Sequence, residues 1–136
     1  MTKLFKRVST VAMAAVMATT IAVSANAAES AHLEADFCGG VADGYIKSNS
    51  VTNTVTVYTT YSDIADRLYV AADVVNTLTG EDITSLPRTV KYNSTRVAYT
   101  SPTIYSNTPI TVFSAHEVFV GSNVWGDYNQ LYNVML

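Results

Sequence analysis

The chain has 136 residues, with eight Lys and Arg, eleven Asp and Glu, and a formal net charge of −3. Three of the eight basic residues precede residue 28, so the 109 residues from 28 to 136 carry five basic against eleven acidic side chains, a net charge of −6. Proteins bind nucleic acids mainly through cationic side chains, so this acidic chain is not expected to have a nucleic-acid partner. A single domain of this size can fold around one core, and carbohydrate, peptide and protein partners stay open.

The first 27 residues have the three parts of a secretory signal peptide. Lys3, Lys6 and Arg7 form a positive start, and an apolar run from residue 8 to residue 23 follows. Ala25 and Ala27 then occupy the A-x-A positions that signal peptidase recognises. The apolar run is shorter than the ~20 residues of a spanning helix. We therefore expect cleavage after Ala27 and a secreted, extracellular protein without a membrane span.

Residues 28–44 are expected to form a loose or short helical segment that precedes the main domain. Glu29 and Glu34 are compatible with a helix, and Gly39 and Gly40 suggest a turn. Cys38 is the single cysteine of the chain. In an exported protein, an odd cysteine is either a buried thiol or one half of an intermolecular disulfide. Both alternatives stay open, and the second predicts a disulfide-linked homodimer.

Residues 45–136 are predicted to form one β domain, because Val, Thr and Tyr dominate this part of the chain. Apolar and polar residues alternate, which predicts strands with one buried face. In chain order the strand-like segments are residues 44–50, 51–61, 67–75, 82–86, 88–100, 110–120 and 124–136. A turn or a single helical turn is expected at 61–66, a hairpin loop around Gly80, and a bulge or turn at 93–95.

This spacing favours a small antiparallel β-sandwich, or a small barrel, of about six to eight strands. A sandwich of the antibody type is excluded, because one cysteine cannot bridge two sheets. Apolar residues continue to the last position. We therefore expect the final strand to pair within the sheet and to bury Val134 and Leu136.

His116 and Glu117 are adjacent within the strand-like segment 110–120, and His32 is the only other histidine. The metalloprotease pattern H-E-x-x-H fails, because Val120 stands where the second histidine would be. Neighbours on a strand point to opposite faces, so His116 and Glu117 are not expected to act as a pair. We expect a buried, structural His116, and we expect no catalytic residue, metal ligand or cofactor.

The aromatic residues are the better candidates for binding a ligand. The chain has nine tyrosines and one tryptophan, and the C-terminal segment combines Trp125, Asp127, Tyr128 and Tyr132. Aromatic planes beside polar groups bind sugar rings or protein surfaces. These four residues are the ligand-binding hypothesis, although tyrosines that fill a β core would give the same pattern.

The favoured function is a secreted, non-enzymatic protein that binds carbohydrate or protein at a cell surface. The alternatives are a carbohydrate-binding module, a bacteriocin-like secreted toxin, or a small extracellular hydrolase that uses His116. The orientation of His116 distinguishes the hydrolase from the others, since a catalytic histidine must face an open cleft.

Overall fold

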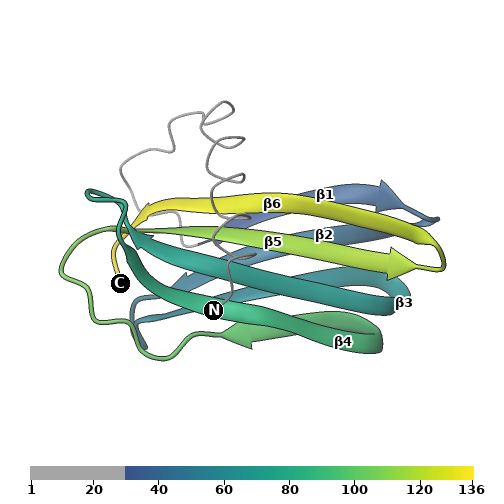
Figure 1. Ribbon diagram of the computed structural model, residues 1–136, viewed down its shortest axis with the longest axis horizontal. Coiled ribbons are helices and arrows are strands. Elements are labelled where there is room, and N and C mark those ends of the chain that lie inside the picture. Colours follow the sequence, from purple (N-terminus) through teal and green to yellow (C-terminus); the bar gives the residue numbers. More distant parts are fainter. Residues whose placement is uncertain (1–29) are drawn as a thin grey trace.

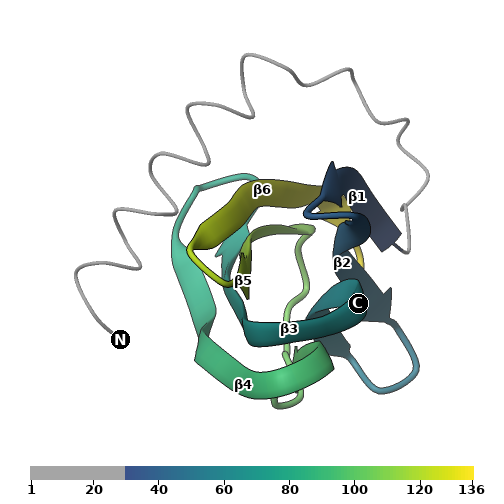
Figure 2. The same cartoon turned by 90° about the vertical axis from the view of Figure 1, so that its right-hand side faces the viewer.

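The computed structural model describes residues 30–136, which form six strands and no helix. They are β1 (Ser30–Phe37), β2 (Gly40–Asn49), β3 (Thr54–Asn76), β4 (Asp82–Thr100), β5 (Ile110–Val120) and β6 (Asn123–Val134). All six belong to one antiparallel sheet (Figure 1). Figure 2 shows that this sheet curls around its interior, and β6 comes into contact with β1 and β2. The predicted all-β, sandwich-like or barrel-like fold is confirmed, while the predicted signal peptide lies outside the described residues.

The long strand β3 organises the sheet. Its first part pairs with β2 between Thr54 and Tyr61, and its second part pairs with β5 between Arg67 and Asn76. Strand β4 accompanies β3 along both parts. Strands β3 and β4 run along the whole curled sheet, and the two parts of β3 pair with different hairpins. The β1–β2 hairpin and the β5–β6 hairpin therefore face each other across the core. Within residues 30–136, no helix is long and apolar enough to cross a membrane.

The turn or single helical turn expected at residues 61–66 is a bulge within β3. The pairing with β4 shifts register between Thr60 and Ala65, and the strand continues on both sides of the shift. On the facing strand, Asn93 has a positive φ of 49°, so both strands bend at the same corner. Strand β4 continues through residues 93–95, so the turn alternative is wrong there, and the extra residues of the bulge lie on β3, where residues 61–64 stand opposite Thr95 alone. The same polar residues favour turns and bulges, which explains the error in β3.

The loose or helical segment expected at residues 28–44 is wrong for the described part of that segment. Ser30–Phe37 form β1, which pairs with β2 along its whole length. Cys38 and Gly39 make the connecting turn with positive φ angles of 47° and 78°. Two consecutive positive φ values are those of the tight hairpin turn whose twist matches that of its strands.

The core lies between the two facing hairpins and the bent β3–β4 pair. Its largest fully enclosed side chains come from five different strands: Ile46, Leu68, Leu86, Ile110 and Leu131. The last strand also contributes: Val134 is 1% exposed, and Leu136 packs against the core just beyond the end of β6. The prediction that the C-terminal strand is integral to the sheet is confirmed.

Candidate functional site

His116 lies on the inner face of β5 and is completely enclosed. Its Nδ1 is 2.8 Å from the Thr59 hydroxyl oxygen, and its Nε2 is 2.7 Å from the Ser114 hydroxyl oxygen. Thr59 also donates a hydrogen bond of 2.8 Å to the Tyr69 carbonyl oxygen. A hydroxyl has a single proton to donate, so Thr59 must accept from His116. This fixes the tautomer: Nδ1 carries the proton, and Nε2 accepts from Ser114.

The surroundings of His116 keep it neutral. Burial lowers the pKa of His116 from 6.5 to about 3, because the charged ring would be cut off from water. Gly44 of β2 passes directly over the ring, where a Cβ on that residue would lie 2.6 Å from the imidazole carbons. Ser114 itself is only 2% exposed. A substrate has no access to this histidine–serine pair, so the geometry supports the structural role expected for His116.

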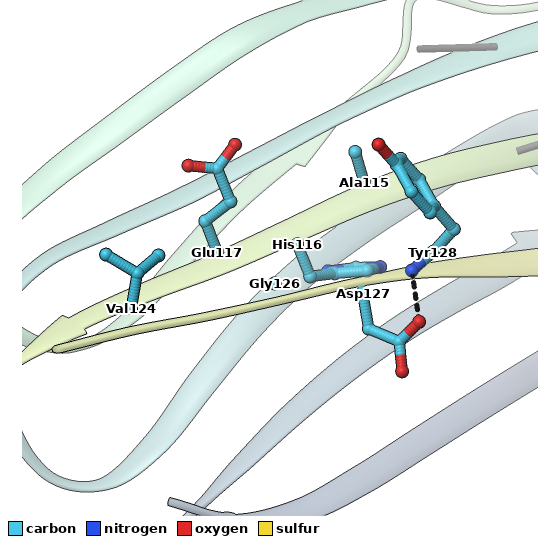
Figure 3. A pocket seen from close by; sticks show the side chains of 7 residues that line it. All are labelled: Ala115, His116, Glu117, Val124, Gly126, Asp127 and Tyr128. Carbon is cyan, nitrogen blue, oxygen red and sulfur yellow. Dashed lines mark hydrogen bonds between the residues drawn. The ribbon is translucent and has the colours of Figure 1, made fainter. Parts of the chain in front are cut away.

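Glu117 points away from His116, as the alternation along a strand requires. Its Oε2 accepts a hydrogen bond of 3.0 Å from the Arg88 guanidinium, and that guanidinium lies 3.8 Å from the centre of the Tyr69 ring. Figure 3 shows Glu117 on the same side of the strands as Ala115 and the Tyr128 ring. The residue is therefore part of an outer surface and has no contact with the buried imidazole.

The four C-terminal candidates do not form one surface. Figure 3 shows the Tyr128 and Asp127 side chains on opposite sides of β6. Trp125 packs against the core, whereas Tyr132 is 44% exposed. A pocket of about 230 Å³ lies beside Tyr128, and it is lined by residues 115–117, 124 and 126–128, although His116 itself is 0% exposed. The structure therefore brings Tyr128 to a surface hollow without the tryptophan that was expected to accompany it.

A different set of aromatic rings is stacked on the outer face of β1, β2 and β3. The rings of His32 and Tyr45 are 4.1 Å apart and nearly parallel, at 9°. Tyr45 and Tyr58 follow at 4.5 Å and 15°. The Arg96 guanidinium of β4 lies 4.3 Å from the Tyr58 ring centre and closes the row. We call His32, Tyr45 and Tyr58 the aromatic stack.

Charged groups border the aromatic stack on both sides. Toward β1, His32 Nε2 lies 2.9 Å from Asp43 Oδ1, and the Thr60 hydroxyl donates to Asp43 Oδ2 at 3.2 Å. Toward β4, Arg96 is joined by Lys47, whose ammonium lies 5.3 Å from the Tyr58 ring centre. Burial raises the pKa of Tyr45 above 10.0, and the nearby Asp43 carboxylate adds to this shift.

This surface was not expected from the sequence, in which His32 falls in a segment predicted to be loose or helical. A usable signal was present. His32, Glu34 and Asp36 alternate with Leu33, Ala35 and Phe37, which is the period of a half-buried strand. Residues 43, 45 and 47 show the same alternation on the neighbouring strand β2.

Cys38 lies in the exposed β1–β2 turn and has no disulfide partner within residues 30–136. This excludes the buried-thiol alternative for the described structure. The Tyr61 hydroxyl of β3 holds the backbone of the turn, since its single proton is shared between the carbonyl oxygens of Phe37 at 2.9 Å and of Cys38 at 3.1 Å.

No protein-family model matches this chain, and no curated protein and no solved structure matches it significantly. The class defined by the structure is an all-β protein with a nearly closed six-stranded sheet, a buried histidine network and an aromatic outer face. Its function has to be inferred from these features.

Proposed function

We propose that this chain is a secreted, non-enzymatic protein that binds a protein partner outside the cell through the outer face of β1, β2 and β3. The aromatic stack is the observation that carries the proposal. Tyrosine offers a large contact area with few rotatable bonds, so it loses little entropy on binding. Here the stacking contacts at 4.1 Å and 4.5 Å already hold the rings in place. A pre-ordered surface of this kind binds with a reduced entropic cost.

The direction of the rings favours a protein over a carbohydrate. Tyr45 has His32 on one face and Tyr58 on the other. Tyr58 has Tyr45 on one face and the Arg96 guanidinium close to its ring. A sugar bound by an aromatic residue lies against an open ring face, but both faces of Tyr45 are occupied, and Tyr58 is only 8% exposed, so the edge of Tyr45 is what this part of the stack offers. Ring edges flanked by carboxylates and cations match the mixed polar and apolar character of protein interfaces.

Two further parts of the proposal concern export and assembly. The signal-peptide pattern of residues 1–27 supports secretion. In an oxidising compartment, the exposed Cys38 would be free to join a second copy of the chain. A dimer linked at this turn would present two aromatic stacks and gain avidity for a cell surface.

The hydrolase alternative loses its main support, because His116 is enclosed and neutral. A general acid or base must come within hydrogen-bond reach of a substrate. The carbohydrate-binding module remains the principal competitor and becomes an outcome of the test.

The test measures binding of the labelled, secreted protein to a panel of bacterial and animal cells. Cells are pretreated either with a protease or with periodate, which destroys sugar diols. We expect binding to be lost after protease and kept after periodate. Tyr45→Ser should weaken binding by about tenfold or more, as expected for a central interface tyrosine. Tyr105→Ser is the matched control, since Tyr105 is 88% exposed in the loop between β4 and β5.

Loss of binding after periodate alone would favour the carbohydrate-binding module. If Tyr45→Ser and Tyr105→Ser bind equally well, the aromatic stack is not part of the interface. Thermal melts of both variants check that each one is folded.

A further inference from the structure

Three potential metal ligands converge beside the aromatic stack. His32 and Glu34 are two residues apart on β1, so they point to the same side of the sheet. Asp43 is the register partner of Glu34 on β2. One ligand atom from each side chain lies within 4.8 Å of the other two. An imidazole with two carboxylates is a donor set that suits zinc.

The register of the β1–β2 hairpin favours binding of a cation to this cluster, because it brings two carboxylates together. Glu34 and Asp43 lie directly opposite each other on neighbouring antiparallel strands. Like charges at directly opposed positions destabilise a sheet, because their side chains are close on one face. A divalent cation between the two carboxylates would turn this repulsion into attraction.

Neighbouring residues already orient two of the three ligands. Stacking on Tyr45 at 4.1 Å fixes the plane of the His32 ring. The Thr60 hydroxyl bonds to Asp43 Oδ2, so that the other oxygen, Oδ1, faces His32 Nε2. Contacts of this kind, made to ligands rather than to the metal, position a metal site and raise its affinity.

We propose that His32, Glu34 and Asp43 bind a zinc ion on the outer face of the β1–β2 hairpin. Tetrahedral zinc with bonds of about 2.0–2.2 Å separates its ligand atoms by about 3.3 Å. His32 Nε2 and Asp43 Oδ1 would therefore move apart slightly from 2.9 Å, and the exposed Glu34 would turn inward. Calcium and magnesium are poorer candidates, since both require more oxygen ligands. Three protein ligands leave the fourth position of zinc for water or for an outside group.

This site goes beyond the proposed function and does not depend on it. Zinc binding requires only the three side chains, whereas the proposed function requires a partner. The two proposals can therefore fail separately.

The test is calorimetric titration of the EDTA-treated, secreted protein with zinc chloride at pH 7.5. We expect one zinc per chain. His32→Gln, Glu34→Gln and Asp43→Asn should each weaken binding by about tenfold or more, which is the scale found when even the supporting residues of a metal site are changed. Asp36→Asn is the matched control: it removes one negative charge from the same exposed face of β1, two residues beyond Glu34.

A second measurement identifies the ligand nitrogen directly. The chain has two histidines, so only two sets of imidazole resonances are expected in NMR spectra. Zinc should shift the His32 set and leave the enclosed His116 set unchanged. The proposal is overturned if no stoichiometric binding occurs, if calcium binds and zinc does not, or if Asp36→Asn weakens binding as much as Glu34→Gln does. Melting curves without metal verify that the variants are folded.

Discussion

Acidification should destabilise the protein through His116. In the folded state this side chain is enclosed, and its pKa is lowered to about 3. In the unfolded state the ring meets water and has its ordinary pKa of 6.5. Between these two values the unfolded chain binds a proton that the folded chain does not bind. The free energy of unfolding therefore falls as the pH drops below 6.5. The contribution of His116 to this fall ends near pH 3.

The size of the effect follows from the separation of the two pKa values. Each pH unit between the two pKa values lowers the free energy of unfolding by about 1.4 kcal/mol. Lowering the pH from 7 to 4.5 crosses about two units of it, which corresponds to about 2.7 kcal/mol. Because a domain of this size has a total stability of about 5–15 kcal/mol, the loss should be easy to measure.

Urea unfolding of the wild-type protein and of His116→Gln at pH 7 and pH 4.5 measures this loss. Glutamine keeps one donor and one acceptor but does not titrate. Carboxylates that titrate in this range affect both proteins alike, so the wild type should lose about 2–3 kcal/mol more than the variant. Equal losses would refute the reasoning. So would an NMR titration in which the His116 ring of the folded protein protonates near pH 6.5, a measurement that does not require a stable variant.

Mass spectrometry of the exported protein should show cleavage at the Ala27–Ala28 bond, and an extracellular form that keeps the first residue would contradict it. Deleting Tyr132–Leu136 removes the buried Val134, a side chain worth about 1.5–3 kcal/mol when fully buried, and the partly buried Leu136, and should give an unfolded or aggregating protein. An unchanged melting temperature would show that these residues are dispensable. Gly44→Ala should destabilise by about 1–3 kcal/mol through its clash with His116, whereas Gly126→Ala, whose Cβ would have its nearest contact at 3.6 Å, should be nearly neutral in the same urea assay. The exposed Cys38 should give a reducible dimer on non-reducing gels, and Cys38→Ser should remain a monomer there.

The sequence predicted the features that depend on local alternation. The row Ile110, Val112, Ser114, His116 and Val118 is buried as its period of two requires. The hairpin loop around Gly80 also follows the expected residues, and Gly80 has the positive φ value of 74° that favours glycine. Each of these features is decided by residues close together in the chain.

The errors concern features that distant residues decide. In isolation, the Ala- and Glu-containing segment around Glu34 is compatible with a helix, and only pairing with β2 makes it a strand. The aromatic stack depends on the register among three strands, which a sequence pattern does not specify. The partner Thr59 lies 57 residues from His116, so the buried role of His116 could be predicted but its hydrogen bonds could not.

The aromatic stack and the buried histidine are linked through adjacent residues of β3. Tyr58 lies in the stack on the outer face, whereas Thr59 points inward and bonds to both His116 and the Tyr69 carbonyl oxygen. Successive residues on a strand point to opposite faces, so the bonds of Thr59 fix the backbone that carries Tyr58. The rigidity of the aromatic stack, which is the surface proposed to bind a partner, therefore comes partly from the core beneath it. Loss of the His116 hydrogen bonds should loosen the stack as well as destabilise the fold, and binding should then weaken even though His116 never touches a partner.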